Sequence, residues 1–571
     1  MKKNIFNKAN AKKILALAMA TTFLMTGCGK SEDKKNETTK AEKETQEETT
    51  EIVIEGEEVP AQLATELNVI GDNYRNYYEI FVGSFCDSDG DGMGDIQGVI
   101  SKLDYINDGD PTTDTDLGCN GIWFMPICPS PTYHKYDVLD YCNIDENYGT
   151  LEDFKQLIAE CDKRGIKVVV DLVINHSSVG HDWFKQAKEY LQNLPEGQEP
   201  NVAECKYVDY YTFKKGEQVG QYYKVGSSDY YYEATFSSNM PELNLASTEV
   251  RKEFEQIMKF WLDLGVGGFR LDAAKEYYSG EPEKSIEVLS WLDSYVESVD
   301  PDAYIVAETW ALDYDRYLES GIDSAFDFGY TEFDSIIPSV VHNNISTYSG
   351  SYFADSLITS QEKAAKYTDA IQAVFIGNHD LNRIANTLAF DSNKIKFAHG
   401  LLSIMNGSTF IYYGDEIGMG GSGADENKRS PMIWSTTDTT GITNGPINMD
   451  ENYVIMRFDS VEDQLKDEAS ILSYVKSAMK LRNMFPEIAR GTVEKITDVQ
   501  DADICAISKT YNDSKIIILA NTDKSETKCV ELSRETHEYT CIQGMLTVGE
   551  DKPYQVEDTI VLPPNSIVVL K

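Results

Sequence analysis

Acidic residues follow short apolar runs at three places along this chain, and this pattern constrains its fold more than any other feature. The runs GFRLD, VAE and FIGNHD carry Asp272, Glu308 and Asp380. Each run has the length and composition of a buried strand, and a helix-like stretch separates it from the next. Acids at the carboxyl ends of successive strands of a parallel barrel point into one mouth, where catalysis in that fold takes place. Two further segments, DLVINH (171–176) and MPELN (240–244), precede them in a fixed order.

The alternation of strand-like and helix-like segments predicts an α/β fold, a (β/α)8 TIM barrel. Helical patterns separate the runs; in 150–165 the pattern ends in a charged turn and a glycine. In 249–265, four apolar side chains share one face and predict core packing. The eight candidate strands are 77–85, 121–127, 167–173, 267–273, 303–310, 324–330, 370–377 and 408–414.

Two regions depart from this alternation and predict further domains. A Tyr- and Gly-rich segment at about 175–246 is too long for a structureless loop, so we expect an inserted domain B after strand 3. Residues 61–490 then form the barrel with this insertion. From 491 to 571 the pattern is strand-like, which predicts a C-terminal antiparallel β-sandwich domain.

The N-terminus has the features of an export signal. A lysine-rich start and an apolar run too short to cross a bilayer (14–27) end in Met-Thr-Gly-Cys, which resembles a bacterial lipoprotein signal with Cys28 as the lipidated residue. Met25 stands where that pattern favours Leu, and an ordinary secretion signal is the alternative. Residues 29–60 are polar and acidic and predict a disordered tether. We therefore expect a lipid-anchored, extracytoplasmic protein at the cell membrane.

The formal net charge of −44 argues against a nucleic-acid partner, because phosphate binding needs clustered Lys and Arg. An acidic surface of this kind is most simply a solvated one. We expect a monomer whose only membrane contact is its lipid anchor.

The five segments together resemble glycoside hydrolase family 13, the α-amylase family, over roughly Tyr77 to Lys571. The resemblance implies a barrel enzyme with domain B and an antiparallel C-terminal domain. It implies Asp272 as nucleophile, Glu308 as general acid/base and Asp380 as the third acid, which holds sugar hydroxyls. Retaining cleavage needs such a nucleophile and acid on either side of the scissile bond.

The same resemblance implies a set of substrate-binding residues. His176 and His379 match histidines that hydrogen-bond the sugar in the cleaved subsite, and Tyr136 matches a tyrosine that stacks on that sugar. The remaining members of the set are Asp137, which follows Tyr136, Arg270, two positions before Asp272 on the same side of its strand, and Lys275. Arg270 is expected to keep the nucleophile ionised through a charge-assisted hydrogen bond.

The segment 87–95, DSDGDGMGD, predicts a Ca²⁺ site. Alternating carboxylates with glycines between them can wrap oxygen ligands around a hard cation. It begins like an EF-hand loop, but Gly98 stands where the bidentate Glu would be, and it resembles instead a calcium loop of some family 13 members. The expected ligands are Asp87, Asp89, Asp91, Asp95 and the Met93 carbonyl; an acidic turn without a metal is the alternative.

Local features favour cleavage of α-1,4 bonds. In the family, a small residue after the nucleophile followed by Lys, here Ala273, Ala274 and Lys275, goes with α-1,4 cleavage. MPELN resembles the group intermediate between oligo-1,6-glucosidases and neopullulanases. We expect a retaining, endo-type, α-amylase-like hydrolase of starch, glycogen or maltooligosaccharides outside the cell. Neopullulanase, oligo-1,6-glucosidase and 4-α-glucanotransferase are alternatives, and so is a non-catalytic starch-binding lipoprotein, which would most simply have lost one of the three acids.

Overall fold

The structure is a computed structural model of the chain, and it describes residues 54–332, 334–343 and 347–571. The chain divides into two units, Met1–Ile54 and Glu55–Lys571. Every element below belongs to the second unit. The predicted signal peptide, Cys28 and most of the predicted tether lie outside the described residues.

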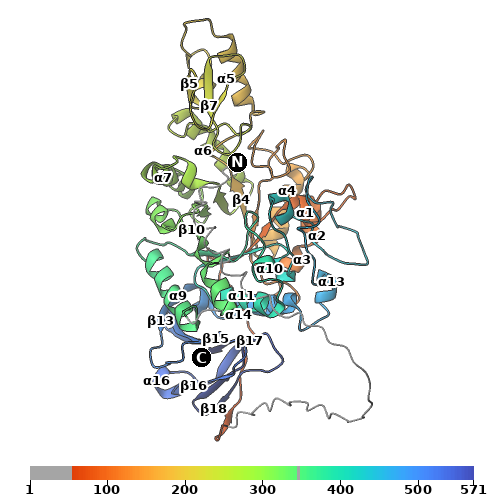
Figure 1. Cartoon of the computed structure of the whole chain (residues 1–571), viewed down its shortest axis with the longest axis vertical. Coiled ribbons are helices and arrows are strands. Elements are labelled where there is room, and N and C mark those ends of the chain that lie inside the picture. Colours follow the sequence, from red (N-terminus) through yellow and green to blue (C-terminus); the bar gives the residue numbers. More distant parts are fainter. Residues whose placement is uncertain (1–53, 333, 344–346) are drawn as a thin grey trace, which may run out of the picture. The chain divides into compact units, whose positions relative to one another are not determined.

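Eight parallel strands close into a barrel, as the sequence predicted (Figure 1). Pairing of β12 with β2, in which Phe410 lies opposite Tyr77, completes the ring. The inside is filled by side chains: the rings of Tyr77 and Phe410 stack with centroids 4.8 Å apart. The barrel is therefore a packed core, and its chemistry belongs at the strand ends. The strands are β2 (Asn76–Ile80), β3 (Gly121–Phe124), β4 (Lys167–Leu172), β8 (Gly268–Leu271), β9 (Tyr304–Ala307), β10 (Ser324–Asp327), β11 (Ala373–Phe375) and β12 (Ser408–Tyr412).

Several barrel helices begin at side-chain caps. Thr150 and Asp153 form a reciprocal capping box at the start of α4 (Leu151–Lys163). Ser247 caps α6 (Thr248–Asp263), whose predicted apolar face is buried. The other α-helices outside domain B are α1 (Val82–Phe85), α2 (Ile96–Ser101), α3 (Leu103–Ile106), α7 (Pro282–Val299), α8 (Ile336–His342), α9 (Gly350–Ala364), α10 (Ile384–Thr387), α11 (Ser392–Ser403), α12 (Asp425–Lys428), α13 (Val461–Gln464), α14 (Ile471–Met484), α15 (Pro486–Arg490) and α16 (Arg534–His537).

A small domain is inserted between β4 and α6, where the sequence predicted domain B. It contains α5 (Asp182–Asn193) and an antiparallel sheet in the order β5-β7-β6. Phe184 on α5 packs edge-on against Tyr211 and Tyr232, so the many tyrosines of this segment form its core. The strands are β5 (Phe213–Lys215), β6 (Tyr222–Lys224) and β7 (Tyr230–Glu233).

The C-terminal region forms two antiparallel sheets, in the orders β13-β14-β15-β20-β17 and β1-β18-β19-β16. Apolar side chains from both sheets, including Leu519 and Ile560, form a common core. The strands are β13 (Thr492–Lys495), β14 (Ile504–Tyr511), β15 (Ser514–Asn521), β16 (Lys528–Glu531), β17 (Ile542–Thr547), β18 (Tyr554–Val556), β19 (Thr559–Leu562), β20 (Ser566–Leu570) and β1 (Glu58–Val59).

The predicted tether, residues 29–60, is too long at its C-terminal end, because β1 lies within it. Glu58 and Val59 pair with Val556 and Gln555 of β18, and the Gln62 amide donates to the Ile542 carbonyl. An edge strand offers unpaired backbone groups that any extended segment can use, whatever its side-chain charge. The tether therefore ends before β1.

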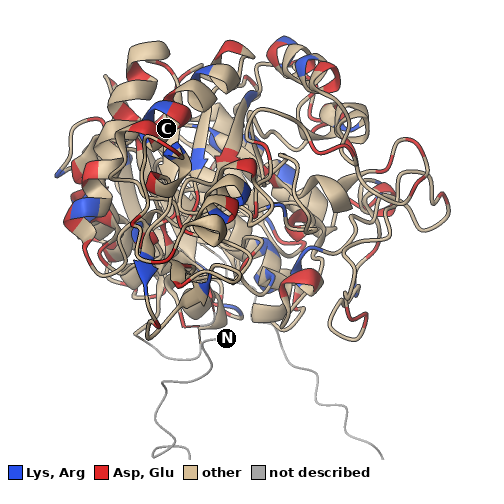
Figure 2. Ribbon diagram, turned by 90° about the horizontal axis from the view of Figure 1, so that it is seen from above, with Lys and Arg blue, Asp and Glu red and all other residues tan. Residues whose placement is uncertain are grey.

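Asp and Glu residues occur on many elements and are interspersed with Lys and Arg (Figure 2). Within the described ranges, no helix has both the length and the apolar character needed to cross a bilayer.

Candidate active site

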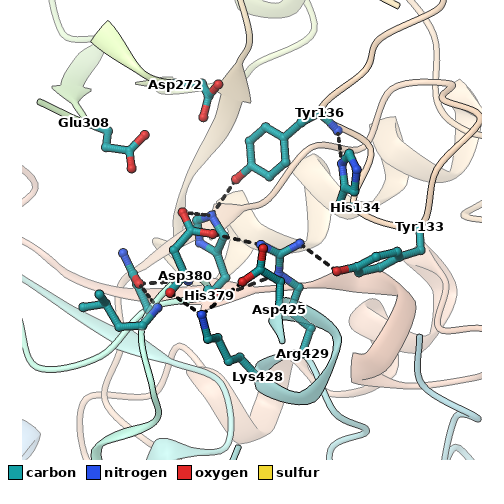
Figure 3. Close-up of polar contacts among 12 residues, drawn as sticks. Tyr133, His134, Tyr136, Asp272, Glu308, His379, Asp380, Asp425, Lys428 and Arg429 are labelled. Carbon is teal, nitrogen blue, oxygen red and sulfur yellow. Dashed lines mark hydrogen bonds and ion pairs between the residues drawn. The ribbon is translucent and has the colours of Figure 1, made fainter. Parts of the chain in front are cut away.

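The three predicted acids lie around one cavity at the carboxyl ends of the barrel strands (Figure 3). Asp272 directly follows β8, Glu308 directly follows β9, and Asp380 lies in the loop after β11. The cavity has a volume of about 710 Å³. It is lined by His134, Tyr136, His176, Phe236, Ser237, Met240, Asp272, Ala273, Lys275, Glu276, Glu308, Thr309, Trp310, Asp380, Asp425 and Arg429.

A single buried guanidinium holds two of these acids. Arg270 is 1% exposed; its Nη1 lies 2.7 Å from Asp272 Oδ1, and its Nη2 lies 2.8 Å from Glu308 Oε2. Nη1 also lies 2.9 Å from Asp171 Oδ1 on β4. Strands β4, β8 and β9 are neighbours in the barrel, so all four groups meet at one edge. A charge buried this deeply is tolerated because it is paired and hydrogen-bonded.

Glu308 has the character of a general acid. Burial raises the pKa of Glu308, and the charges of Asp272 and Asp380 add to this effect while Arg270 opposes it. The backbone amide of Ala273 donates to Glu308 Oε2 at 3.0 Å. Ala273 adopts a left-handed conformation, with φ of 48°, directly after the predicted nucleophile. The backbone turn therefore links the position of Glu308 to that of Asp272.

Asp380 is held in its ionised form. Burial alone would raise the pKa of Asp380, but His379 and Arg429 outweigh it and place that pKa far below its usual range. Arg429 Nη2 lies 2.9 Å from Asp380 Oδ1, and His379 Nε2 lies 3.2 Å from Asp380 Oδ2. An ionised carboxylate accepts hydrogen bonds from hydroxyl groups, which suits the role of holding a sugar.

The predicted substrate residues fall into two groups. Tyr136, His176 and Lys275 line the cavity. Asp137, Arg270 and His379 are not among the lining residues, and their contact with substrate stays a prediction. They are 1%, 1% and 0% exposed, respectively. Asp137 accepts a hydrogen bond from Ser130 Oγ at 2.7 Å, so it supports the loop that carries Tyr136.

The predicted calcium loop brings three of its four carboxylates together. Ligand atoms of Asp87, Asp89 and Asp95 lie within 4.8 Å of one another. Asp91 is not part of this group; its Oδ1 accepts a hydrogen bond from the Met93 amide at 2.7 Å. Gly92 lets the loop turn tightly: its φ is 93°, and a Cβ at this position would come within 1.9 Å of Asn444 Nδ2.

Comparisons with known proteins agree with this geometry. The family description "Alpha amylase, catalytic domain" matches residues 79–491. The chain belongs to the alpha-amylase family of glycoside hydrolases.

The alignments with its relatives span nearly the full length of those proteins. "Alpha-amylase 3" of Dictyoglomus thermophilum is 34% identical over 87% of this chain and 93% of that protein. "Oligo-1,6-glucosidase" of Bacillus cereus is 27% identical over 86% of this chain and 98% of that protein. The solved structure "Eubacterium rectale Amy13B" is 42% identical, covers 89% of this chain and 97% of its own, and superimposes with a TM-score of 0.83.

Sequence reasoning missed several residues of this glycosidase site. Arg429, which directly follows α12, was not among the predicted site residues. Its Nη1 donates to Tyr133 Oη at 3.3 Å while Nη2 holds Asp380. His134 also lines the cavity, and its Nδ1 accepts a hydrogen bond from the Tyr136 amide at 3.1 Å. Burial lowers the pKa of His134 to about 4, so its ring is neutral near pH 7.

Two exposed aromatic side chains also line the cavity. Trp310 is 45% exposed, and its ring stacks on Phe328 with centroids 4.8 Å apart and planes 9° from parallel. Phe236 of the inserted domain is 47% exposed. Aromatic faces suit the apolar faces of pyranose rings. Both residues were absent from the predicted set because an isolated aromatic in a loop has no distinctive sequence pattern.

The Arg270 cluster generates a pH-dependent stability prediction. In Arg270→Met, Asp171 and Glu308 lose the guanidinium that opposes the effect of burial, so the pKa of each rises further above its unfolded value. The folded state then binds more protons, so its stability rises as the pH falls. We expect a loss of about 3–5 kcal/mol in unfolding free energy at pH 7, shrinking toward pH 4–5. Urea unfolding at both pH values measures it.

The control is Lys259→Met, which removes an exposed partner of Asp263. It should leave the free energy of unfolding almost unchanged at either pH, because an exposed ion pair is screened by solvent. A deficit in Arg270→Met that is equal at both pH values would contradict this account of the cluster.

Proposed function

We propose that the enzyme is a retaining, endo-type hydrolase of α-1,4-glucosidic bonds in starch, glycogen or maltooligosaccharides. The observation that carries this proposal is the pairing of Asp272 and Glu308 through Arg270 at the cavity wall. Asp272 lies 2.7 Å from the guanidinium, and Glu308 is a buried acid with a raised pKa. Double displacement needs a carboxylate nucleophile and a protonated acid at one bond.

In the first step, Asp272 attacks the anomeric carbon and Glu308 gives its proton to the departing glycosidic oxygen. The C–O bond of the substrate breaks and an ester to Asp272 forms. In the second step, Glu308 takes a proton from water, whose oxygen displaces Asp272 and regenerates both groups. Asp380 accepts hydrogen bonds from hydroxyls of the same sugar. Tyr136 and His176, at the cavity wall, position its ring.

Specificity for α-1,4 bonds rests on the small residues Ala273 and Ala274 and on the 34% identity to a protein named alpha-amylase. The exposed faces of Trp310 and Phe236 come from different parts of the fold and suit a glucan longer than a disaccharide. An oligo-1,6-glucosidase is the second candidate, because a relative of that name aligns over 98% of its length. A purely binding protein is disfavoured, since all three acids are present and joined to the site.

The test is product analysis on amylose, pullulan and isomaltose with wild type, Asp272→Asn and Glu308→Gln. Wild type should release short oligosaccharides from amylose and act weakly on isomaltose. Each variant should lose activity by about a thousandfold or more, because each removes one half of the double displacement. Glu362→Gln, an exposed change on α9, is the matched control and should behave as wild type.

Substantial amylose hydrolysis by folded Asp272→Asn would sink the assignment of the nucleophile. Cleavage of isomaltose in preference to amylose would favour the oligo-1,6-glucosidase. Products longer than the starting maltooligosaccharide would favour a glucanotransferase.

We propose further that the loop 87–95 binds Ca²⁺ and stabilises the fold. Asp87, Asp89 and Asp95 supply carboxylate oxygens, the ligands that Ca²⁺ prefers. The loop also carries backbone contacts to the segment 439–444: the Asp87 amide donates to the Gly441 carbonyl at 3.0 Å. A cation here would fix a loop that is hydrogen-bonded to a distant part of the chain, so we expect its effect to be on stability.

Chelation should therefore lower the melting temperature, because an ion bound only by the native state adds stability. The measurement is a thermal melt of calcium-loaded enzyme with and without EDTA. Asp89→Asn should weaken the response, and Asp114→Asn, in a separate acidic loop, should keep it. An unchanged melt of protein shown by metal analysis to be loaded would argue against the site.

We propose that Cys28 carries a lipid anchor that holds the enzyme outside the cytoplasmic membrane. The support is the apolar run ending in Met-Thr-Gly-Cys and the polar segment after it. Durable anchoring needs more than one acyl chain, as a bacterial lipoprotein has. A flexible tether would let the barrel reach a polymer too large to import.

Replacing Cys28 by Ala should move the enzyme from the detergent-extracted membrane fraction to a soluble fraction. Cys529→Ala, a change at an exposed cysteine of the C-terminal domain, should not. Wild-type protein that is soluble and carries no lipid by mass spectrometry would favour ordinary secretion.

A further inference from the structure

A carboxylate buried behind the active site has no part in the mechanism above. Glu79 lies on β2, is 1% exposed, and contacts the ring of His379 on the side away from Asp380. We propose that Glu79 is a positioning residue: its charge keeps both ring nitrogens of His379 protonated, so that His379 holds Asp380 ionised and oriented for the sugar. This inference rests on the role proposed for Asp380.

The ring of His379 is fully engaged. Its Nδ1 lies 2.5 Å from Glu79 Oε1. Its Nε2 lies 2.7 Å from Tyr136 Oη and 3.2 Å from Asp380 Oδ2. His379 is 0% exposed, so water cannot replace any of these partners. One imidazole therefore stands between two carboxylates, one in the barrel and one at the cavity.

With Glu79 and Asp380 both ionised, a doubly protonated ring is the form that satisfies all three contacts. Nδ1–H donates to Glu79, and Nε2–H donates toward Asp380 and the Tyr136 oxygen. Tyr136 is then free to donate its own proton to Asp171 Oδ2, at 3.3 Å. A neutral ring would turn a nitrogen lone pair toward one of the two carboxylates, which is repulsive in a buried site.

The surrounding charges favour the imidazolium. Burial lowers the pKa of His379, but Asp380 and then Glu79 raise it more, to about 9. Tyr136 stacks on the ring from the segment after β3, with centroids 5.8 Å apart. The edge contact with Trp123 of β3 adds no charge.

Three other charged groups act on His379 and Asp380. Asp171 of β4 interacts with His379 across the Tyr136 hydroxyl. Arg429 and Arg270 act on Asp380, and Arg429 Nε also donates to the His379 carbonyl at 3.4 Å. Asp415 also interacts with Glu79; burial raises the pKa of Asp415 to about 7, and Arg383, whose Nη1 lies 2.9 Å from Asp415 Oδ1, opposes that rise. Glu79 is thus the carboxylate that contacts Nδ1.

Glu79→Gln separates charge from packing. The amide oxygen of Gln can still accept the Nδ1 hydrogen bond, so the ring stays in place while the charge is lost. His379 should then release its second proton at a lower pH. Above that pH Asp380 loses its ring donor, and the sugar hydroxyls lose an oriented acceptor. The defect should appear in KM and should grow as the pH rises.

The experiment is a titration of the full-length enzyme followed by two readouts. The first is the NMR signal of the His379 ring, labelled at Cε1 and assigned with His379→Gln among the seven histidines. The second is kcat/KM on a maltooligosaccharide between pH 5 and 9, within the range where His379 of the wild type stays largely protonated. The matched control is Glu416→Gln: Glu416 is 0% exposed and accepts hydrogen bonds from Tyr78 and Tyr105.

We expect the pKa of His379 to fall by at least about one unit in Glu79→Gln and to stay unchanged in Glu416→Gln. For each pH unit above the new His379 pKa, kcat/KM should fall by a further factor of about ten relative to wild type. At pH 5 to 6 the variant should approach wild type.

An unchanged His379 pKa in folded Glu79→Gln would overturn the proposal, and so would a pH profile parallel to wild type with only its amplitude reduced. Should the variant not fold, the wild-type titration decides: a His379 pKa below about 7 means that Glu79 does not hold the proton. The NMR readout needs no activity, so its result stands apart from that of the proposed function.

Discussion

The buried guanidinium of Arg270 is the group on which the active site depends. It is 1% exposed and lies within hydrogen-bonding distance of carboxylates from three neighbouring parts of the barrel. A charge in this position is unfavourable without partners, and each acid would be unfavourable without the charge. Because the partners extend from adjacent strands, the closed barrel is what brings them together. Fold and chemistry therefore depend on the same interaction.

A second buried cluster joins the barrel to the C-terminal sheets. Lys509 of β14 is 0% exposed and donates to the carbonyls of Ile404 and Ile488 at 2.7 and 2.6 Å. Arg482 of α14 donates to the Ser403 carbonyl at 3.2 Å. The loop that these residues contact leads into β12. Gly407 in this loop has φ of 81°. A Cβ at Gly407 would lie 2.0 Å from the carbonyl oxygen of Gln372, so the position needs glycine. The C-terminal domain thus contacts the loop that precedes the last barrel strand.

The sequence contained enough information to predict the barrel and its acids, because both follow from local patterns. Asp272 and Glu308 directly follow apolar strands, and no tertiary knowledge is needed to place them at the barrel mouth. The layer behind the acids could not be predicted in this way. His379 is predicted to hydrogen-bond the sugar, but its contact with Glu79, 300 positions earlier in the chain, leaves no local sequence signal. The role of Arg429 and the pairing of β1 could not be predicted for the same reason. Their partners are distant in the sequence, and no local pattern indicates them.

The central claim is that Asp272 and Glu308 act in sequence on one anomeric carbon, with Asp272 bonded to it in between. The most direct measurement is the proton NMR spectrum of the products during the first minutes of maltooligosaccharide hydrolysis, before mutarotation mixes the anomers. Two displacements at one carbon return its original configuration. The account predicts newly formed reducing ends in the α configuration. Initial products in the β configuration would contradict it, because a single displacement by water would then have occurred.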